Sequence, residues 1–204
     1  GSNRNDSVIT NCYYLEGTAP GGVNGVDIAD QADSLPEVYM KSSYFVADLG
    51  NDNWKIVSGA NNGYPVLEWQ EGTEIVTKPV IMYQNTNAIV PSTSLEKLES
   101  GTNILKPGSE QYGPYCTLET GIYRIRYVGE NLNVIPNTSY RSYTNFDSNG
   151  FREFSLNFEK YENTEVIYTI TIDRNTTHVE TVLTNSSQQN INIDYILFEW
   201  IGNP

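Results

Sequence analysis

The chain has 204 residues and few cationic side chains. Lys and Arg together number 12 against 25 Asp and Glu, which gives a formal net charge of -13. A surface of this sign repels phosphate backbones, so we expect neither nucleic acid nor anionic membranes as partners. The chain also lacks a run of about 18 apolar residues, so no transmembrane helix and no membrane insertion are predicted.

Cysteine is scarce as well. Cys12 and Cys116 are the only two, and isolated cysteines carry no zinc-binding spacing. A disulfide between them would close a loop of about 100 residues and add a few kcal/mol in the chain-entropy model. Free Cys, however, behaves as a small apolar residue in protein cores. We favour two unpaired, half-buried thiols.

Motifs for serine, zinc and nucleotide chemistry are missing. The chain has no Gly-x-Ser-x-Gly, no His-Glu-x-x-His, no P-loop and no Rossmann fingerprint. Carboxylate pairs for glycoside hydrolysis depend on a distance that only the tertiary structure sets, and scattered acidic residues usually keep a surface soluble. We therefore expect no enzymatic activity and no organic cofactor. The carboxylates in question are Glu153, Glu159, Glu162, Glu165, Asp173 and Glu180.

Tyrosine is abundant, with 15 residues, and hydrophobic residues make up 38% of the chain. Few Lys, many Asn, Thr, Ser and Tyr, and little Ala or Leu are typical of secreted or cell-surface β-proteins. The opening Gly-Ser resembles a vector scar, so we expect a piece excised from a longer protein.

Helical signals are confined to Ser34–Gly50. Ser34 and Glu37 have the spacing of a capping box, and Gly50 is placed to end a helix. The polar residues 41–43 predict two short helices rather than one. After the helices, Tyr64–Gln70 is predicted as an edge strand because Pro65 cannot donate to a ladder.

From residue 80 onward, strand signals alternate with turn residues, which predicts an antiparallel β-sandwich of jelly-roll type. Tyr123, Ile125 and Tyr127 share one face, predicted to point to the core, and Arg124 and Arg126 share the other. Near its end the strand 191–200 is apolar on both faces, which predicts a central or covered strand. The expected fold is mostly β: a small α+β unit at 1–72, a linker at 73–79 and the sandwich at 80–204.

The motifs "ITNCYYLEG", "MKSSYFVADLGNDNW" and "NNGYPVLEWQ" occur in this order between residues 8 and 70. This part resembles the closing unit of GLUG-type repeat regions, which occur in large secreted and wall-attached proteins of Gram-positive gut bacteria. The preceding repeats are missing. The resemblance implies that Trp54 and Trp69 are structural and close a small core with Leu35, Phe45, Val46, Leu49 and Leu67. The other interpretation is that exposed tryptophans form a sugar platform.

The motifs "QYGPYCTLETGIYRIRYVGENL" and "INIDYILFEW" belong to the second part, roughly 76–204. This part is similar to the non-catalytic, carbohydrate-binding jelly-roll modules found beside glycan-degrading domains. The similarity implies the fold more strongly than it implies a ligand.

The segment Asn137–Phe151 is the main candidate site. We predict a long loop there, in which aromatic faces cover the apolar patches of a sugar ring and polar side chains bind its hydroxyls. The alternative is that Tyr140 and Phe151 are core-facing ends of strands. The predicted glycan-binding residues are Tyr140, Arg141, Tyr143, Asn145 and Phe146, with Tyr112 and Tyr115 as a second cluster.

Two further features leave alternatives open. Asp147 and Asn149 in "NFDSNG" suit an oxygen-liganded calcium ion, or they form an ordinary Asx/Gly turn. Arg124 and Arg126 contact a ligand, or they pair with carboxylates of neighbouring strands.

The sequence thus predicts a non-catalytic module that binds a polysaccharide or host glycan, within a large bacterial protein that is secreted or attached to the cell wall. Neighbouring domains of the same parent chain are the other expected partners. The alternative is a structural stalk or adhesin domain, or a docking domain, with no small-molecule site.

Overall fold

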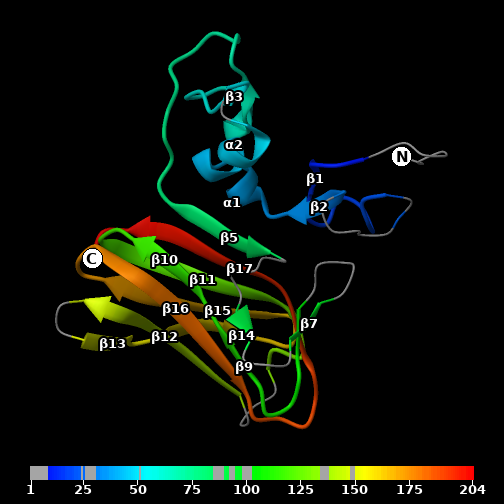
Figure 1. The fold of residues 1–204 in the computed structure, drawn as a ribbon. Coiled ribbons are helices and arrows are strands. Elements are labelled where there is room, and N and C mark those ends of the chain that lie inside the picture. The colour runs from blue at the N-terminus through cyan, green and yellow to red at the C-terminus, as the bar shows by residue number, and fades with distance from the viewer. Residues whose placement is uncertain are drawn as a thin grey trace. The chain divides into compact units, whose positions relative to one another are not determined.

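The computed structural model describes residues 9–23, 25, 31–50, 52–84, 90–91, 95–97, 103–133, 138–147 and 150–204. Within these, only the backbone is described for 83–84, 90–91, 95–97, 114, 138–147 and 150–152. The chain divides into two compact units, Gly1–Ile81 and Met82–Pro204 (Figure 1). The division falls inside strand β5 (Val80–Gln84), two residues from the predicted start of the sandwich.

The first unit is small and mixes helices with short strands. β1 and β2 pair in parallel, and β3 and β4 pair antiparallel. Its elements are β1 (Cys12–Leu15), β2 (Ala32–Leu35), α1 (Glu37–Met40), α2 (Ser43–Leu49), β3 (Trp54–Lys55), a 3-10 turn (Asn61–Gly63) and β4 (Val66–Leu67).

The two predicted helices are present, but the predicted capping box is wrong. Ser34 belongs to β2, and Pro36 is the N-cap of α1 without a side-chain cap. The cap that forms is Ser42, whose hydroxyl accepts a hydrogen bond from the Phe45 backbone N–H at 3.2 Å. α1 begins at Glu37 with Pro36 as its N-cap, so Ser34 lies two residues before the N-cap and Glu37 is the first helical residue instead of the third. Gly50 ends α2 with a φ of 91°, which favours glycine.

The core of the first unit contains three of the seven predicted side chains, and Trp69 is not among them. Leu35, Phe45 and Val46 are buried, whereas Trp69 is 79% exposed. Trp69 follows β4 in a turn closed by the Gln70 N–H and the Leu67 carbonyl at 2.9 Å. The expected burial of Trp69 is therefore wrong. Leu49, Trp54 and Leu67 are half-buried.

The segment predicted as a linker is hydrogen-bonded to the first unit. The Ile75 N–H donates to the Ile56 carbonyl at 2.9 Å, and Val57 and Glu74 form a β-bridge. Further along, the Thr77 N–H donates to the Ser43 hydroxyl at 2.9 Å. Residues 74–77 are therefore part of the first unit.

The second unit is a β-sandwich, as predicted. Figure 1 shows its two layers of strands. In the described part of the chain, one is a six-stranded sheet ordered β13-β12-β16-β9-β6, with β10 beside β16. The other is a seven-stranded sheet ordered β14-β15-β11-β17-β8-β7, with β5 beside β17. Strand pairs with a described register are antiparallel in this unit. The strands are β6 (Val90–Pro91), β7 (Leu95–Lys97), β8 (Asn103–Leu105), β9 (Glu110–Tyr112), β10 (Pro114–Leu118), β11 (Gly121–Glu130), β12 (Thr138–Asp147), β13 (Gly150–Phe154), β14 (Asn157–Tyr161), β15 (Glu165–Ile172), β16 (Thr176–Asn185) and β17 (Ile191–Gly202).

The predicted alternation of β11 is confirmed. Tyr123, Ile125 and Tyr127 are fully buried between the sheets, and the intervening side chains are half-buried on the outer face. β17 is central, with β11 on one side and β8 and β5 on the other. Its residues 195–198 are all buried, as its apolar faces predict.

A buried polar cluster joins the two sheets. The Tyr127 hydroxyl of β11 donates to the side-chain amide oxygen of Gln111 on β9 at 3.2 Å and is hydrogen-bonded to the Thr181 hydroxyl of β16. Thr181 and Gln111 therefore face the core, and their strand neighbours on either side face outward. Cys12 and Cys116 are both free thiols, with Cys116 buried and Cys12 exposed.

Candidate functional site

The predicted loop at 137–151 is wrong. Residues 138–147 form β12, which pairs with β16 along Thr138–Thr144, and β13 begins at Gly150. The Thr and Tyr residues of this segment suit a pleated surface, and the sheet satisfies their backbone groups. The interspersed Ser and Asn, read from the sequence as loop signals, are strand residues. Asn137 and Asn149 lie outside the described residues.

The strand register separates the predicted binding residues. Arg141 lies opposite Val182 and Tyr143 opposite Glu180, whereas Tyr140 lies opposite the core residue Leu183. Directly opposed residues share a face of the sheet. Arg141 and Tyr143 thus occupy positions on the outer face of the six-stranded sheet, and Tyr140 has a core position. Past Thr144 the β12–β13 pairing shifts, and Asn145 and Phe146 have no paired partner on β13, while Asp147 lies opposite Gly150.

Tyr112, from the second predicted cluster, lies on the same outer face. Glu110, two residues before it on β9, lies opposite Thr184. The Thr184 hydroxyl donates to one Glu110 carboxylate oxygen at 3.0 Å, and the Tyr112 hydroxyl donates to the other. All three side chains are half-buried, so each retains surface for a ligand.

Tyr115 reaches this face through a break in the strand. The β10–β16 register shifts between Pro114 and Cys116, and Tyr115 between them has a φ of 60°. Positive φ is rare for a bulky residue, and bulges of this kind redirect side chains beside functional sites. The Tyr115 side chain is 40% exposed.

Glu180 lies at the centre of the outer face. It is only 1% exposed, which is rare for glutamate. Burial, the Glu180 charge and a hydrogen bond to Glu180 together raise the pKa of the Tyr115 phenol. The Tyr115 hydroxyl therefore stays protonated and able to donate. We name the set Glu110, Tyr112, Tyr115, Glu180 and Thr184, with the register positions of Arg141 and Tyr143, the outer-face cluster.

Glu110, Glu180 and Thr184 were not among the predicted glycan-binding residues, and Glu180 was considered only as one of the scattered carboxylates. Glu180 carried one usable signal, because it interrupts the apolar stretch of β16 between Val179 and Val182. Its relation to Tyr115 could not be foreseen, because 65 residues separate the two along the chain.

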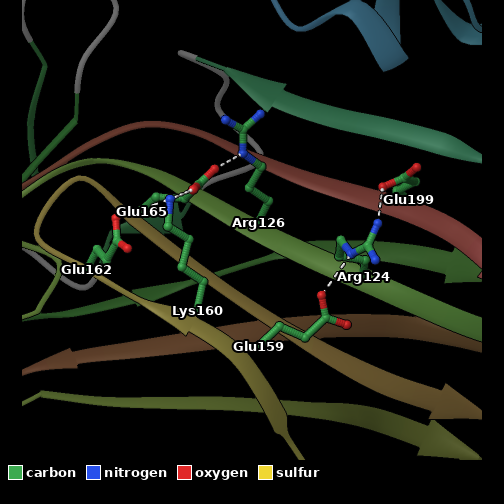
Figure 2. Close-up of polar contacts among 7 residues, drawn as sticks. All are labelled: Arg124, Arg126, Glu159, Lys160, Glu162, Glu165 and Glu199. Atoms are coloured by element: carbon green, nitrogen blue, oxygen red, sulfur yellow. Dashed lines mark hydrogen bonds and ion pairs between the residues drawn. The ribbon is translucent and has the colours of Figure 1, made fainter.

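Arg124 and Arg126 pair with carboxylates of neighbouring strands, which decides between the two interpretations given above. Figure 2 shows the ion-pair network on the outer face of the seven-stranded sheet. Arg124 contacts Glu159 at 3.1 Å and Glu199 at 3.4 Å. Arg126 pairs with Glu165, which also accepts from Lys160. Three of the candidate catalytic carboxylates, Glu159, Glu162 and Glu165, thus belong to a structural network.

Glu165 is the best-shielded carboxylate of this network, with its side chain 13% exposed. Burial alone would raise its pKa. The hydrogen bonds from Lys160 and Arg126, with their positive charges, outweigh that effect and leave the pKa of Glu165 below its usual value of 4.5.

We expect Glu165→Gln to lower the free energy of unfolding by about 1–2 kcal/mol at pH 7. A carboxylate with a lowered folded-state pKa contributes stability above its unfolded pKa and loses it as the pH falls through the folded value. The deficit of the variant should therefore shrink below about pH 4.5. Urea unfolding across pH 3–7 measures it. Glu162→Gln, which removes a 61% exposed partner of the same Lys160, should cost less than about 0.5 kcal/mol. If the stability difference between Glu165→Gln and the unmodified protein does not change with pH, the lowered pKa of Glu165 is contradicted.

Among the residues whose side chains are described, no group of three or more His, Cys, Asp or Glu could hold a metal ion. The predicted calcium ligands are not among them, because Asp147 is described only by its backbone and Asn149 lies outside the described residues. Calcium binding there stays a prediction.

No protein-family model matches the chain, and no curated protein is similar to it. Within the described part of the chain, no helix has the length and apolar composition needed to cross a membrane. The resemblances to GLUG-type repeats and to carbohydrate-binding modules therefore stay predictions.

Proposed function

We propose that the second unit is a non-catalytic glycan-binding module of a larger bacterial protein that is secreted or attached to the cell wall. The observation that carries this proposal is the outer-face cluster. It combines tyrosine rings with fixed carboxylate and hydroxyl groups on one face of a rigid sheet. Aromatic rings cover the apolar side of a sugar, and the oxygens bind its hydroxyls. The first unit holds this module within the parent chain, whose neighbouring domains are its other partners.

The net charge of -13 and the carboxylates of the cluster favour ligands without negative charge. We expect modest affinity, because a shallow sugar site exchanges its hydrogen bonds with water. Glu159, Glu162 and Glu165 form ion pairs with basic side chains. Because these ion pairs engage the carboxylates in contacts within the sheet, they support a role without catalysis.

A glycan array followed by calorimetry on the full chain tests the proposal, using plant, starch, mucin and host-type glycans with and without calcium. We expect Tyr115→Ala and Tyr143→Ala each to weaken binding about tenfold, because each removes a ring of the outer-face cluster. Phe158→Ala is the matched control, since Phe158 is a half-exposed aromatic residue on the other sheet. It should bind as the unmodified protein does.

One observation favours a second candidate. Trp69 and Val76 of the first unit are 79% and 84% exposed, and exposed apolar side chains mark an interaction surface where they join in one patch. They support the alternative of a stalk or adhesin domain that docks onto a neighbouring domain. Trp69→Ala separates the two candidates in the same array. Loss of glycan binding in this variant alone would move the sugar site to the first unit. If the folded, unmodified protein binds no glycan of the array, the docking candidate is favoured.

A further inference from the structure

Two residues with positive φ lie close together in the strand pair β10 and β16. Tyr115 on β10 has a φ of 60°, and His178 on β16 has a φ of 56°. This left-handed backbone is uncommon for residues other than glycine, and it persists only where the surrounding structure imposes it. Both residues also lie where the β10–β16 register shifts. The strand pair that carries Tyr115 and Glu180 thus contains two irregularities rather than one.

The register shows that the two irregularities cancel. The paired residues are Pro114 with Glu180, Cys116 with Val179, and Leu118 with Thr176. Between the first two pairs, β10 has the residue Tyr115 and β16 has none. Between the last two pairs, β16 has Thr177 and His178, whereas β10 has only Thr117. We call these the β10 bulge and the β16 bulge. The extra residue of the first is matched by the extra residue of the second.

Hydrogen bonds hold the strand pair on both sides of the bulges. Before the β10 bulge, the Thr181 N–H donates to the Gly113 carbonyl at 2.7 Å. After the β16 bulge, the Thr120 N–H donates to the side-chain oxygen of Asn175 at 2.9 Å. Because both ends are held, neither strand accommodates an extra residue between them unless its partner has one too. The β10 bulge therefore requires the β16 bulge.

The bulges decide which side chains of β10 face the core. Without the β10 bulge, regular alternation from Pro114 would turn Tyr115 toward the core and Cys116 outward. The structure has the opposite arrangement, because Cys116 is buried and the Tyr115 side chain is 40% exposed. Tyr115 is hydrogen-bonded to Glu180 on the outer face. The two bulges together thus bring the Tyr115 ring to the outer-face cluster.

The identity of residue 178 controls the β16 bulge through the backbone. Histidine, like Asn and Asp, is enriched among the residues other than glycine that adopt positive φ, whereas a β-branched residue there is an outlier. Thr177, the other residue of this bulge, is β-branched and is not among the described residues with positive φ. His178 is therefore the residue whose replacement by a β-branched one opposes the bulge.

We propose that His178 is a positioning residue for the outer-face cluster: its left-handed backbone maintains the β16 bulge, and this bulge holds the Tyr115 ring where a glycan stacks on it. The inference rests on the proposed glycan binding and adds a residue that acts without touching the ligand. It predicts that the backbone preference of residue 178, and not its imidazole, governs glycan affinity.

A substitution series in the full chain tests the proposal. His178→Gly and His178→Asn accept positive φ, His178→Ala accepts it less well, and His178→Val resists it. Each variant is screened on the array of plant, starch, mucin and host-type glycans, followed by calorimetry with those that the unmodified protein binds. The Gly and Asn variants should keep the affinity. The Val variant should bind about tenfold more weakly, as Tyr115→Ala does, and the Ala variant should lie between.

The position of the Tyr115 ring can be measured without a ligand. Burial, the charge of Glu180 and a hydrogen bond to Glu180 raise the pKa of the Tyr115 phenol. NMR of protein with isotope-labelled tyrosine rings follows this pKa, and Tyr115→Phe assigns the signal. The pKa should stay raised in the Gly and Asn variants. It should fall toward its usual value in the Val variant, because there the ring leaves Glu180.

Asn157→Val is the matched control for the introduction of valine. Asn157 is an exposed residue of β14 on the other sheet, and it is not among the described residues with positive φ. This variant should change neither the glycan affinity nor the pKa of Tyr115. A loss equal to that of His178→Val would overturn the assignment of the effect to the β16 bulge.

The failures are distinguishable. Weaker binding by the folded Gly and Asn variants would make the imidazole a ligand contact and overturn the positioning role. An unchanged affinity in the folded Val and Ala variants would overturn it as well, and the Ala variant decides if the Val variant does not fold. If the pKa of Tyr115 follows the backbone preference of residue 178 but the folded, unmodified protein binds no glycan, the positioning of Tyr115 stands and the proposed function is overturned.

Discussion

Phe198→Ala should lower the free energy of unfolding by about 3–5 kcal/mol, the usual cost of a cavity the size of a buried aromatic ring. Phe198 lies in the middle of β17 and is fully buried. Its neighbours on the strand, Ile196 and Leu197, are buried too, and so closely packed a site cannot collapse to fill the space. Urea unfolding followed by far-UV circular dichroism measures the change.

The matched substitution is Phe158→Ala in β14. Phe158 is 50% exposed and packs edge-on against Tyr161 at 5.7 Å between ring centroids. Removal of the Phe158 ring leaves an open surface rather than a cavity, so we expect the free energy of unfolding to fall by at most about 1 kcal/mol. Equal losses for the two phenylalanines would mean that β17 is not the centre of the core.

Gly129→Ala should also be severe and should lower the free energy of unfolding by about 3 kcal/mol. Gly129 lies on β11, where the pairing with β17 shifts between Val128 and Gly129. A Cβ atom added here would lie 1.9 Å from the backbone carbonyl oxygen of Asn192. A backbone atom cannot rotate away as the end of a side chain can, so the two central strands would have to separate.

Gly202→Ala is the control for this prediction. Gly202 lies on β17, one of the same two strands, and a Cβ atom there would meet nothing within 4 Å. We expect a change within about 0.5 kcal/mol. Thermal unfolding of both variants, compared with hydrogen exchange of the β11 and β17 amides, shows whether the loss is local to this pair. Similar stability of the two variants would refute the close approach at Gly129.

The two units contribute differently to the proposed function. The sandwich supplies a rigid surface on which side chains from β9, β10 and β16 lie beside register positions of β12, and sites built on strands are more precise than sites on loops. The first unit, with its exposed Trp69, offers a surface of another kind, suited to contact with a neighbouring domain. The Trp69→Ala arm of the glycan array therefore assigns a role to each unit in one experiment.

Several features were predictable because they depend on local pattern alone. The period of two in Gly121–Tyr127 placed Tyr123, Ile125 and Tyr127 in the core, and the apolar faces of the last strand marked it as central. The two short helices and the glycine that ends the second followed from local signals as well. The scarcity of Lys and Arg set the sign of the net charge without any structural information, and the absence of phosphate-rich partners that it predicts stays a prediction.

The candidate site could not be predicted in this way. Local pattern shows which residues of a strand share a face, but it does not show which other strand lies beside it or in what register. The segment expected to be a loop is strand β12, which pairs with β16. This register places Tyr140 at a core position and Tyr143 opposite Glu180. Trp69, which the resemblance to GLUG-type repeats had implied was buried, lies in a turn and is exposed.

The sequence by itself therefore determined the class of the fold, the faces of its best-patterned strands and the sign of its surface charge. Each of these follows from neighbours along the chain or from composition. Only the tertiary structure decided that Glu110, Tyr115 and Glu180 share one face. Glu180 is 65 positions from Tyr115 and 70 from Glu110, and long-range strand pairing brings them together.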